Sequence, residues 1–323
     1  MLLFDLPGYL KKITMKYRLN LAFALLTLLV AAQSCQHKVK KSDPDRFTAA
    51  NAKIVIDESF QPIVDEELYI FTALYHDAHP SVIYAPENTA INLLMEDSVR
   101  VAVIARDLTP DEYKVLRSRN LNPIINRFAI DAVTLIVNQA STDTTITVSE
   151  IKKMLNGDNK QNKNIVFDNP NSGLVRYLKE FSGNKDFKQK NIYALKSNKE
   201  VIKYVSEHPD AIGITGFSWL NDPDKDYAAA VEKVKIVGVK DDVSKNATNE
   251  YFTPSQNTLA LKQYPLTRNL YILNFTGKMG VGMEFAAFIA GDRGQRIILK
   301  SGLLPDEIPG REIVIESKIK TKQ

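Results

Sequence analysis

Apolar residues along the chain follow two alternating patterns from Ile54 onward. Short runs rich in β-branched residues, of which Ile54-Val55-Ile56 is the first, predict buried strands. Between these runs, apolar residues recur at helical spacing, as at Val64, Leu68 and Phe71, which share one helix face. This alternation is typical of a doubly wound sheet and predicts an α/β fold. Further strands are predicted at residues 82–84, 99–104, 132–137, 165–167, 192–194 and 211–214.

Two capping boxes mark helix starts. Thr109 is followed by Pro110 at the first helical position and by Glu112 three positions on. Thr147 and Glu150 repeat this spacing before another apolar segment. Because each box satisfies N–H groups that a helix start leaves free, a helix is predicted to begin at each.

Charged segments at residues 221–233 and 240–250 interrupt the alternation and predict surface loops of a second α/β unit. Beyond them, strands are predicted near Thr258–Leu261 and Asn269–Leu273, followed by two helices. We expect this last part to rejoin the first unit, because one sheet with insertions is simpler than a third domain. A ligand is then expected between the lobes, at the carboxyl ends of strands. The predicted layout is one lobe of residues 52–130 and 251–314, a second lobe of residues 131–250, and a tail of residues 315–323.

The N-terminal segment has the pattern of a bacterial signal peptide. Lys16 and Arg18 precede a twelve-residue apolar run, Leu21–Ala32. This run is too short for a membrane-spanning helix, which needs roughly 20 apolar residues. We therefore expect residues 1–34 to be removed, and the part before Met15 to be an extension upstream of the usual start.

Cys35 is the only cysteine of the chain and directly follows a small residue. This placement resembles the lipid-attachment site of bacterial lipoproteins, although Ala32 stands where leucine is usual. We expect Cys35 to carry a lipid anchor on the periplasmic side of a bacterial membrane, and the polar residues 35–51 to form a tether. The alternative is an incidental cysteine near the end of an ordinary signal peptide.

Composition and charge disfavour several classes of function. The 323 residues are 44% hydrophobic and 25% charged, as in globular proteins. Without residues 1–34 the chain has 38 basic and 37 acidic residues, and this net charge of +1 disfavours nucleic acid as a partner. A single cysteine allows neither an intrachain disulfide nor a cysteine metal cluster.

Enzyme signatures are weak. The segment Gly216-Phe217-Ser218-Trp219-Leu220 resembles a nucleophile elbow but ends in leucine where that motif has glycine. His76 and His79 lie three positions apart near a helix end, and a metal site needs further ligands. We therefore expect a binding protein with no catalytic residue, no metal and no cofactor.

Polar loops that follow a strand and open a helix are the strongest candidates for a binding site. A helix N-terminus presents unpaired N–H groups and a partial positive charge, and both favour anions. The alternative for each loop is that its serine or asparagine simply caps the helix, as these residue types commonly do. Three such loops are Ser59-Phe60, Glu87-Asn88-Thr89 and Asn169-Pro170-Asn171-Ser172-Gly173.

A fourth loop adds positive charge. Arg106 and Asp107 directly follow the strand that ends at Ile104. The planar guanidinium of an arginine matches an oxyanion, and the neighbouring carboxylate is an acceptor. The alternative is that Arg106 merely pairs with Asp107 or caps the loop.

Taken in order, these loops resemble those of the PstS-like phosphate-binding proteins of ABC transporters. The resemblance implies the periplasmic-binding-protein type II fold, with phosphate dehydrated between two lobes and held by backbone N–H groups, hydroxyls and an arginine. It also implies an acidic acceptor that receives a hydrogen bond from protonated phosphate and thereby rejects sulfate. The matching pieces span about residues 52–314 and are Ser59-Phe60-Gln61-Pro62, Ala105-Arg106-Asp107-Leu108, Asn171-Ser172-Gly173, Ala211-Ile212-Gly213-Ile214-Thr215-Gly216, Tyr264-Pro265-Leu266-Thr267-Arg268, Gly294-Gln295-Arg296-Ile297-Ile298 and Gly302-Leu303-Leu304-Pro305.

One loop departs from the pattern of this family. Asp168 stands where the family commonly has arginine, and Leu174 stands where it has threonine. We expect Arg106 to supply the missing charge, with Asp107 or Asp168 as the acceptor. Arg176 is a less direct substitute, because helical side chains lean toward the N-terminus by only about one position.

The sequence thus predicts a monomeric solute-binding lipoprotein that captures phosphate or a related small anion and delivers it to an ABC permease. The alternative is a lipid-anchored protein of the same fold that binds a different ligand or a protein partner. The residues expected to contact the ligand are Ser59, Phe60, Glu87, Asn88, Thr89, Arg106, Asp107, Asp168, Asn169, Asn171, Ser172 and Gly173.

Overall fold

The strands of the protein join into one large mixed sheet and one small sheet. The computed structural model describes residues 52–158, 163–245 and 247–310, which all belong to one compact unit. Within these residues the large sheet has ten strands, in the order β2-β1-β3-β11-β4-β8-β6-β7, and β9 and β12 also pair with β4. The small sheet contains β5 and β10. The strands are β1 (Lys53–Asp57), β2 (Ser81–Ala85), β3 (Val101–Ile104), β4 (Ile124–Asn138), β5 (Thr145–Thr147), β6 (Asn164–Phe167), β7 (Ile192–Ala194), β8 (Ala211–Gly216), β9 (Val234–Ile236), β10 (Gly238–Lys240), β11 (Thr267–Asn274) and β12 (Leu304–Pro305).

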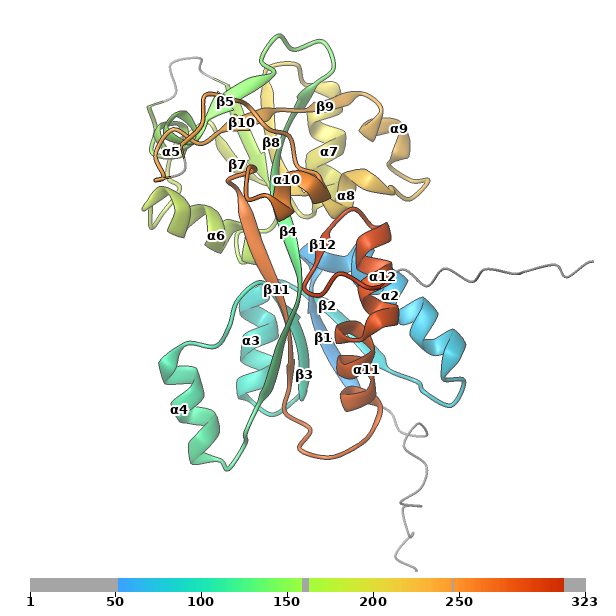
Figure 1. The fold of residues 1–323 in the computed structure, drawn as a ribbon. Helices are drawn as coiled ribbons and strands as arrows, with labels where there is room; N and C mark the ends of the chain where they lie inside the picture. Colours follow the sequence, from blue (N-terminus) through green and yellow to red (C-terminus); the bar gives the residue numbers. More distant parts are fainter. Residues whose placement is uncertain (1–51, 159–162, 246, 311–323) are drawn as a thin grey trace, which may run out of the picture. The chain divides into compact units, whose positions relative to one another are not determined.

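Helices cover the large sheet on both faces. Side chains of a strand alternate between the faces, so Ile54 and Ile56 of β1 point one way and Val55 points the other. Ile54 and Ile56 pack in a core with α2, α11 and α12, whereas Val55 packs in a core with α3. Figure 1 accordingly shows α3 and α11 on opposite sides of β1 and β3. The helices are η1 (Glu58–Phe60), α2 (Gln61–Leu74), α3 (Glu87–Met95), α4 (Pro110–Ser118), α5 (Val148–Leu155), α6 (Gly173–Ser182), α7 (Asn198–Glu207), α8 (Ser218–Asn221), α9 (Ala228–Val231), α10 (Gln256–Ala260), α11 (Val281–Ala290) and α12 (Asp292–Lys300).

β4 links the two halves of the large sheet. Its first part pairs with β11 and its last part with β8, both antiparallel. The buried core divides along the same strand, because Ala129 packs in the cluster of Ile54 and Ala132 packs in the cluster of Val133. We call these clusters the first core and the second core. Figure 1 shows β4 and β11 running between the two halves.

The predicted α/β fold is confirmed, and one predicted element is wrong. The strand expected over Thr258–Leu261 is instead α10, because Ser255 and Thr258 form a capping box that starts a short helix. The boundaries of the two lobes stay a prediction. Leu259 and Tyr264, which fall in the segment expected to rejoin the first lobe, pack in the second core.

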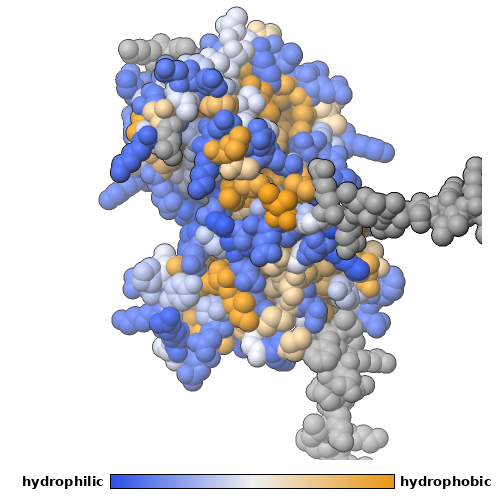
Figure 2. Space-filling model, in the orientation of Figure 1, coloured by the Kyte–Doolittle hydropathy of each residue, from blue (hydrophilic) through white to orange (hydrophobic). Residues whose placement is uncertain are grey.

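The predicted signal peptide, the lipid-attachment residue Cys35 and the tether, residues 1–51, lie outside the described residues. Among the helices that the structure does describe, none is long and apolar enough to cross a membrane. On the face drawn in Figure 2, most of the surface is hydrophilic, and hydrophobic side chains gather mainly near the middle of the view.

Candidate functional site

Buried polar residues converge where two strands end and two helices begin. Asp57 is the last residue of β1 and Asp168 directly follows β6, while Glu87 opens α3 and Gly173 opens α6. The three acidic side chains are at most 1% exposed. Phe60 beside this cluster packs in the first core, whereas Leu174 packs in the second core. The cluster therefore lies between the two cores.

Asp57 bridges the two cores through backbone N–H groups. Its carboxylate accepts hydrogen bonds from the Ser59 N–H at 3.0 Å and from the Gly173 N–H at 3.1 Å. The second donor is the first residue of α6, whose N-terminus favours a negative charge. A Cβ on Gly173 would lie 2.5 Å from the Asp57 carboxylate and 2.7 Å from that of Glu87, so any side chain here would force these carboxylates to shift.

Asp168 is the centre of a hydrogen-bond network. Its carboxylate accepts from the Ser172 hydroxyl at 2.6 Å, from the Ser59 hydroxyl at 3.1 Å and from the Asn198 amide at 3.1 Å. The carbonyl oxygen of Asn198 in turn accepts from the Thr215 hydroxyl at 2.7 Å. Ser59 thus contacts Asp57 through its backbone and Asp168 through its side chain.

Glu87 is held by one backbone donor and by Arg176. The Ala105 N–H donates to its carboxylate at 3.1 Å, and the Arg176 guanidinium donates to both of its oxygens. Arg106 lies farther away, with its Nε 3.8 Å from Glu87, because its two terminal nitrogens each donate to Glu112 at 2.7 Å. The structure therefore places Arg176 closer to the cluster than Arg106.

A second arginine, Arg268, lies beside the cluster and is buried. The Nε of Arg268 donates to Asp131 at 2.9 Å, and its guanidinium carbon lies 4.4 Å from the centre of the Phe60 ring. Arg268 is 4% exposed, and its Nη1 has no hydrogen-bond acceptor among the residues that the structure describes. A Cβ on Gly216 would lie 2.9 Å from Nη2, so glycine makes room for the guanidinium.

Two buried acids of the cluster, Asp57 and Asp168, hold protons more tightly than exposed acids do because their pKa values are raised. Burial, with the neighbouring charge of Glu87, raises the pKa of Asp57 to about 7, against the opposing effect of the Ser59 N–H. Burial also raises the pKa of Asp168, although its hydrogen bond with Ser172 opposes the rise. Near neutral pH, Asp57 therefore exists both as a carboxylate and as a neutral acid.

Six of the twelve residues expected at the site share this cluster. They are Ser59, Phe60, Glu87, Asp168, Ser172 and Gly173.

The other six lie at its edge or point elsewhere. Asn88, Thr89 and Asn171 are exposed, although the Asn88 N–H donates to the Asn171 carbonyl at 3.3 Å. Asp107 is also exposed and accepts from the Tyr113 hydroxyl at 2.9 Å. The Asn169 side chain accepts from the Asn171 N–H within its own loop, and Arg106 faces Glu112. Whether any of them contacts a ligand stays a prediction.

Sequence reasoning missed several residues of the cluster. The sequence predicts Asp57 as the start of the turn that follows Ile54-Val55-Ile56, and Asn198 as the start of a helix. Arg268 belongs to one of the segments that carry the family resemblance. Its partner Asp131 is a charged residue inside an apolar stretch, and this is the signal that could have singled out the pair. The missed residues are Asp57, Asp131, Asn198, Thr215 and Arg268.

Comparison with known proteins agrees with this architecture. A family model described as a PBP superfamily domain matches residues 41–293. The chain is 23% identical over 298 residues to the phosphate-binding protein PstS of Borreliella burgdorferi, covering 87% of this chain and 97% of the relative.

Two solved structures share the fold. One is described as a phosphate ABC transporter substrate-binding protein with bound phosphate from Clostridium perfringens, with a TM-score of 0.66 and 19% identity, covering 80% of this chain and all of that one. The other is an ABC-type phosphate transport receptor from Vibrio cholerae, with a TM-score of 0.60 and 18% identity, covering 79% of this chain and all of that one. The predicted two-lobed periplasmic-binding-protein fold is thereby confirmed.

Proposed function

Because the chain belongs to the family described as the PBP superfamily domain, we propose that it is a solute-binding protein of an ABC importer. Its proposed ligand is a small oxyanion, and phosphate is the preferred one. One observation carries this proposal: N–H donors attached to two separate cores converge on one buried carboxylate. The Ser59 and Gly173 N–H groups lie 3.0 and 3.1 Å from Asp57. An oxyanion that accepts hydrogen bonds from both donors would link the two lobes, so its binding would favour closure of the lobes.

In this proposal the carboxylate of Asp57 stands in for a bound oxyanion. Carboxylate and phosphate oxygens accept from the same N–H donors, and a helix N-terminus attracts both. When the lobes open, the Gly173 N–H separates from Asp57 and becomes free for a ligand. The hydroxyls of Ser59 and Ser172, which donate to Asp168, are further donors in the same place.

Acceptors in the cluster favour an oxyanion that carries a proton. Phosphate keeps at least one proton at neutral pH and can donate it to Asp57 or Asp168, whereas sulfate has none to donate. Sulfate would leave a buried acceptor unpaired, which costs about 1–3 kcal/mol for each group. We therefore expect phosphate to be preferred over sulfate.

We propose that the guanidinium of Arg268 contacts the bound oxyanion. Burial is the main cause that raises the pKa of Asp57 and of Asp168, and the charge of Arg268 opposes the rise in both, so Arg268 lies within electrostatic range of both acids. The assignment differs from the sequence-based prediction for Arg106, whose terminal nitrogens are engaged by Glu112.

The remaining features of the proposal concern the whole protein. Cys35 is proposed to carry a lipid that holds the monomeric protein on the periplasmic side of a bacterial membrane, next to an ABC permease. Residues 52–130 with 251–314 are proposed as one lobe, and residues 131–250 as the other. The proposal includes no catalytic step.

A second candidate is a protein of the same fold with another kind of ligand or a protein partner. One observation favours it: Asp57 and Glu87 already accept from the Ser59, Gly173 and Ala105 N–H groups, so the site is satisfied by its own carboxylates. A ligand rich in hydrogen-bond donors would suit such a site better than a dianion.

Calorimetric titration of phosphate into the mature protein and three variants tests the proposal. Replacing Arg268 by Met together with Asp131 by Leu removes both members of the buried pair, which keeps the fold better than removing one. We expect this double variant to bind phosphate at least about 2 kcal/mol more weakly. The sequence-based prediction is instead that Arg106→Ala weakens phosphate binding by this amount and that Arg176→Ala weakens it much less. A parent protein that binds no phosphate would favour the second candidate.

A further inference from the structure

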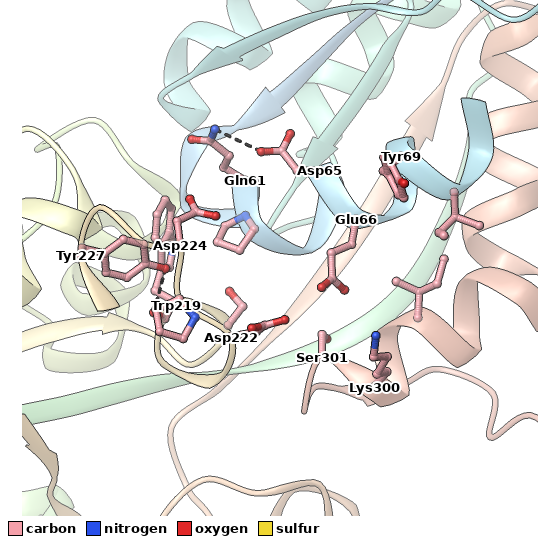
Figure 3. A pocket seen from close by; sticks show the side chains of 15 residues that line it. Gln61, Asp65, Glu66, Tyr69, Trp219, Asp222, Asp224, Tyr227, Lys300 and Ser301 are labelled. Carbon is pink, nitrogen blue, oxygen red and sulfur yellow. Dashed lines mark hydrogen bonds between the residues drawn. The ribbon is translucent and has the colours of Figure 1, made fainter. Parts of the chain in front are cut away.

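A cavity of about 520 Å³ lies next to the polar cluster, between α2, α8 and α12 (Figure 3), and Trp219 in its wall donates to the Ser59 carbonyl at 2.8 Å. Its volume is within the range of small-molecule sites. Ile63 of α2 and Ile298 of α12 pack in the first core, whereas Trp219 of α8 packs in a cluster with Ile136 and Val166. The cavity shares no lining residue with the cluster around Asp57. It is therefore a second place where two separately packed parts of the protein meet.

The lining of the cavity is strongly acidic. Four carboxylates, those of Asp65, Glu66, Asp222 and Asp224, face one ammonium, that of Lys300. Figure 3 shows Glu66, Asp222 and Lys300 directed toward the same space. Burial and the charge of Asp222 raise the pKa of Glu66, against the opposing charge of Lys300. Two carboxylates from different parts of the chain thus repel each other across the cavity.

Two of these carboxylates have partners, and two do not. Asp65 accepts from Gln61 at 3.2 Å, and Asp224 accepts from the Lys199 ammonium at 2.9 Å. The carboxylates of Glu66 and Asp222 make no hydrogen bond or ion pair with the residues that the structure describes, although the charge of Lys300 acts on Glu66. A bound cation between them would replace repulsion by attraction.

A buried hydroxyl independently indicates a ligand. Ser218 lines the cavity, is 4% exposed, and its Oγ has no hydrogen-bond partner in the described part of the chain. Buried hydroxyls are normally paired, so an unpaired one on a cavity wall is suited to a polar ligand atom.

Two residues that line the cavity, Tyr227 and Asp224, already contact an ammonium group of the protein itself. The Nζ of Lys199 lies 5.1 Å from the centre of the Tyr227 ring and pairs with Asp224. Aromatic faces attract cations, and Trp219, Tyr69 and Tyr227 all line the cavity. Aromatic surface with carboxylates is the combination that binds protonated amines.

We propose that this cavity binds a small organic cation bearing protonated amines, with Glu66 and Asp222 as its anionic partners and Ser218 as an acceptor. Such a ligand would join α2 and α12 to α8. A bare metal ion is a poorer fit, because the described residues contain no group of three side chains placed to ligate one.

Calorimetric titration of 1,4-diaminobutane into the mature protein, at fixed ionic strength in phosphate-free buffer, tests this site. We expect binding by the parent and none of 1,4-butanediol, which has the same length without charge. Glu66→Gln and Asp222→Asn should each weaken diamine binding by roughly tenfold or more. Glu207→Gln, an exposed acid of α7, is the matched control and should leave binding unchanged.

Thermal unfolding without ligand adds a second readout that does not depend on binding. Removing one of two repelling carboxylates should leave Glu66→Gln folded with an unfolding midpoint equal to or above that of the parent. The proposal is wrong if the parent does not bind the diamine, if butanediol binds equally, or if both site variants bind the diamine as the parent does.

Discussion

The carboxylate of Asp57 accepts a hydrogen bond from the Gly173 N–H at 3.1 Å, across 116 residues of sequence. Asp57 ends a strand of the first core, and Gly173 opens a helix of the second. This contact joins the two cores through a charge that belongs to the protein itself. A ligand that enters between the lobes must therefore replace this carboxylate or share its donors.

Gly173→Ala should destabilise the protein. The added Cβ would lie 2.5 Å from the Asp57 carboxylate, so these groups must move apart, at a cost of about 1–3 kcal/mol. Urea unfolding measures the loss. Gly310→Ala is the control, because a Cβ at Gly310 has no neighbour within 4 Å among the described residues. Equal stability of the parent and Gly173→Ala would contradict the close packing around Asp57.

Asp57→Asn should flatten the dependence of stability on pH. The pKa of Asp57 is raised from 3.8 to about 7, so folding takes up a proton between these values. The contribution of Asp57 to the free energy of unfolding therefore falls as pH rises from about 4 to about 7. The variant lacks this titration, and unfolding measured at pH 5 and pH 8 should show a smaller difference than in the parent. An unchanged difference would show that Asp57 titrates normally.

Glu67 is a buried acid outside both sites. Its two carboxyl oxygens have no hydrogen-bond partner among the described residues, and burial, with Glu66 nearby, raises its pKa to about 9. Folding thus takes up a proton between about pH 4.5 and 9, so the contribution of Glu67 to stability falls as pH rises through this range. Glu67→Met should stabilise the protein by about 1–4 kcal/mol at pH 9 and less at pH 6. A variant less stable than the parent at pH 9 would contradict this account.

Features set by neighbouring residues were predictable from the sequence. The capping boxes at Thr109 and Thr147 lie within four residues each, and both start helices as expected. Ser172 also caps its helix, since its hydroxyl accepts from the Val175 N–H at 3.2 Å. The same hydroxyl donates to Asp168, so the capping and cluster interpretations of Ser172 hold together.

Features set by distant residues were not predictable in the same way. Arg268 meets Asp131 across 137 residues, and no local pattern links them. The β-branched and apolar residues near Thr258 favoured a strand, but the cap at Ser255 and the packing of Leu259 in the second core give a short helix. Arg106 was expected to face a ligand, and the first turn of α4 supplies Glu112 as its partner instead.

Cys35→Ser should release the protein from the membrane or block its maturation. The expectation is based on the apolar run Leu21–Ala32 and the small residue before Cys35. Fractionation of cells, followed by detection of the protein in membrane and soluble fractions, measures the change. A variant that fractionates and migrates like the parent would show that Cys35 carries no lipid.

The central claim is that the cluster between the two cores binds phosphate through donors from both. Calorimetry of phosphate and sulfate with the mature protein, at pH 6 and pH 8, tests it most directly. We predict that phosphate binds at least about 100-fold more tightly than sulfate at pH 8, because only phosphate can donate to the carboxylates of Asp57 and Asp168. Phosphate should also bind more tightly at pH 6 than at pH 8, since neutralising Asp57 below its pKa of about 7 removes a repelling charge. No phosphate binding, or equal affinity for sulfate, would contradict the claim.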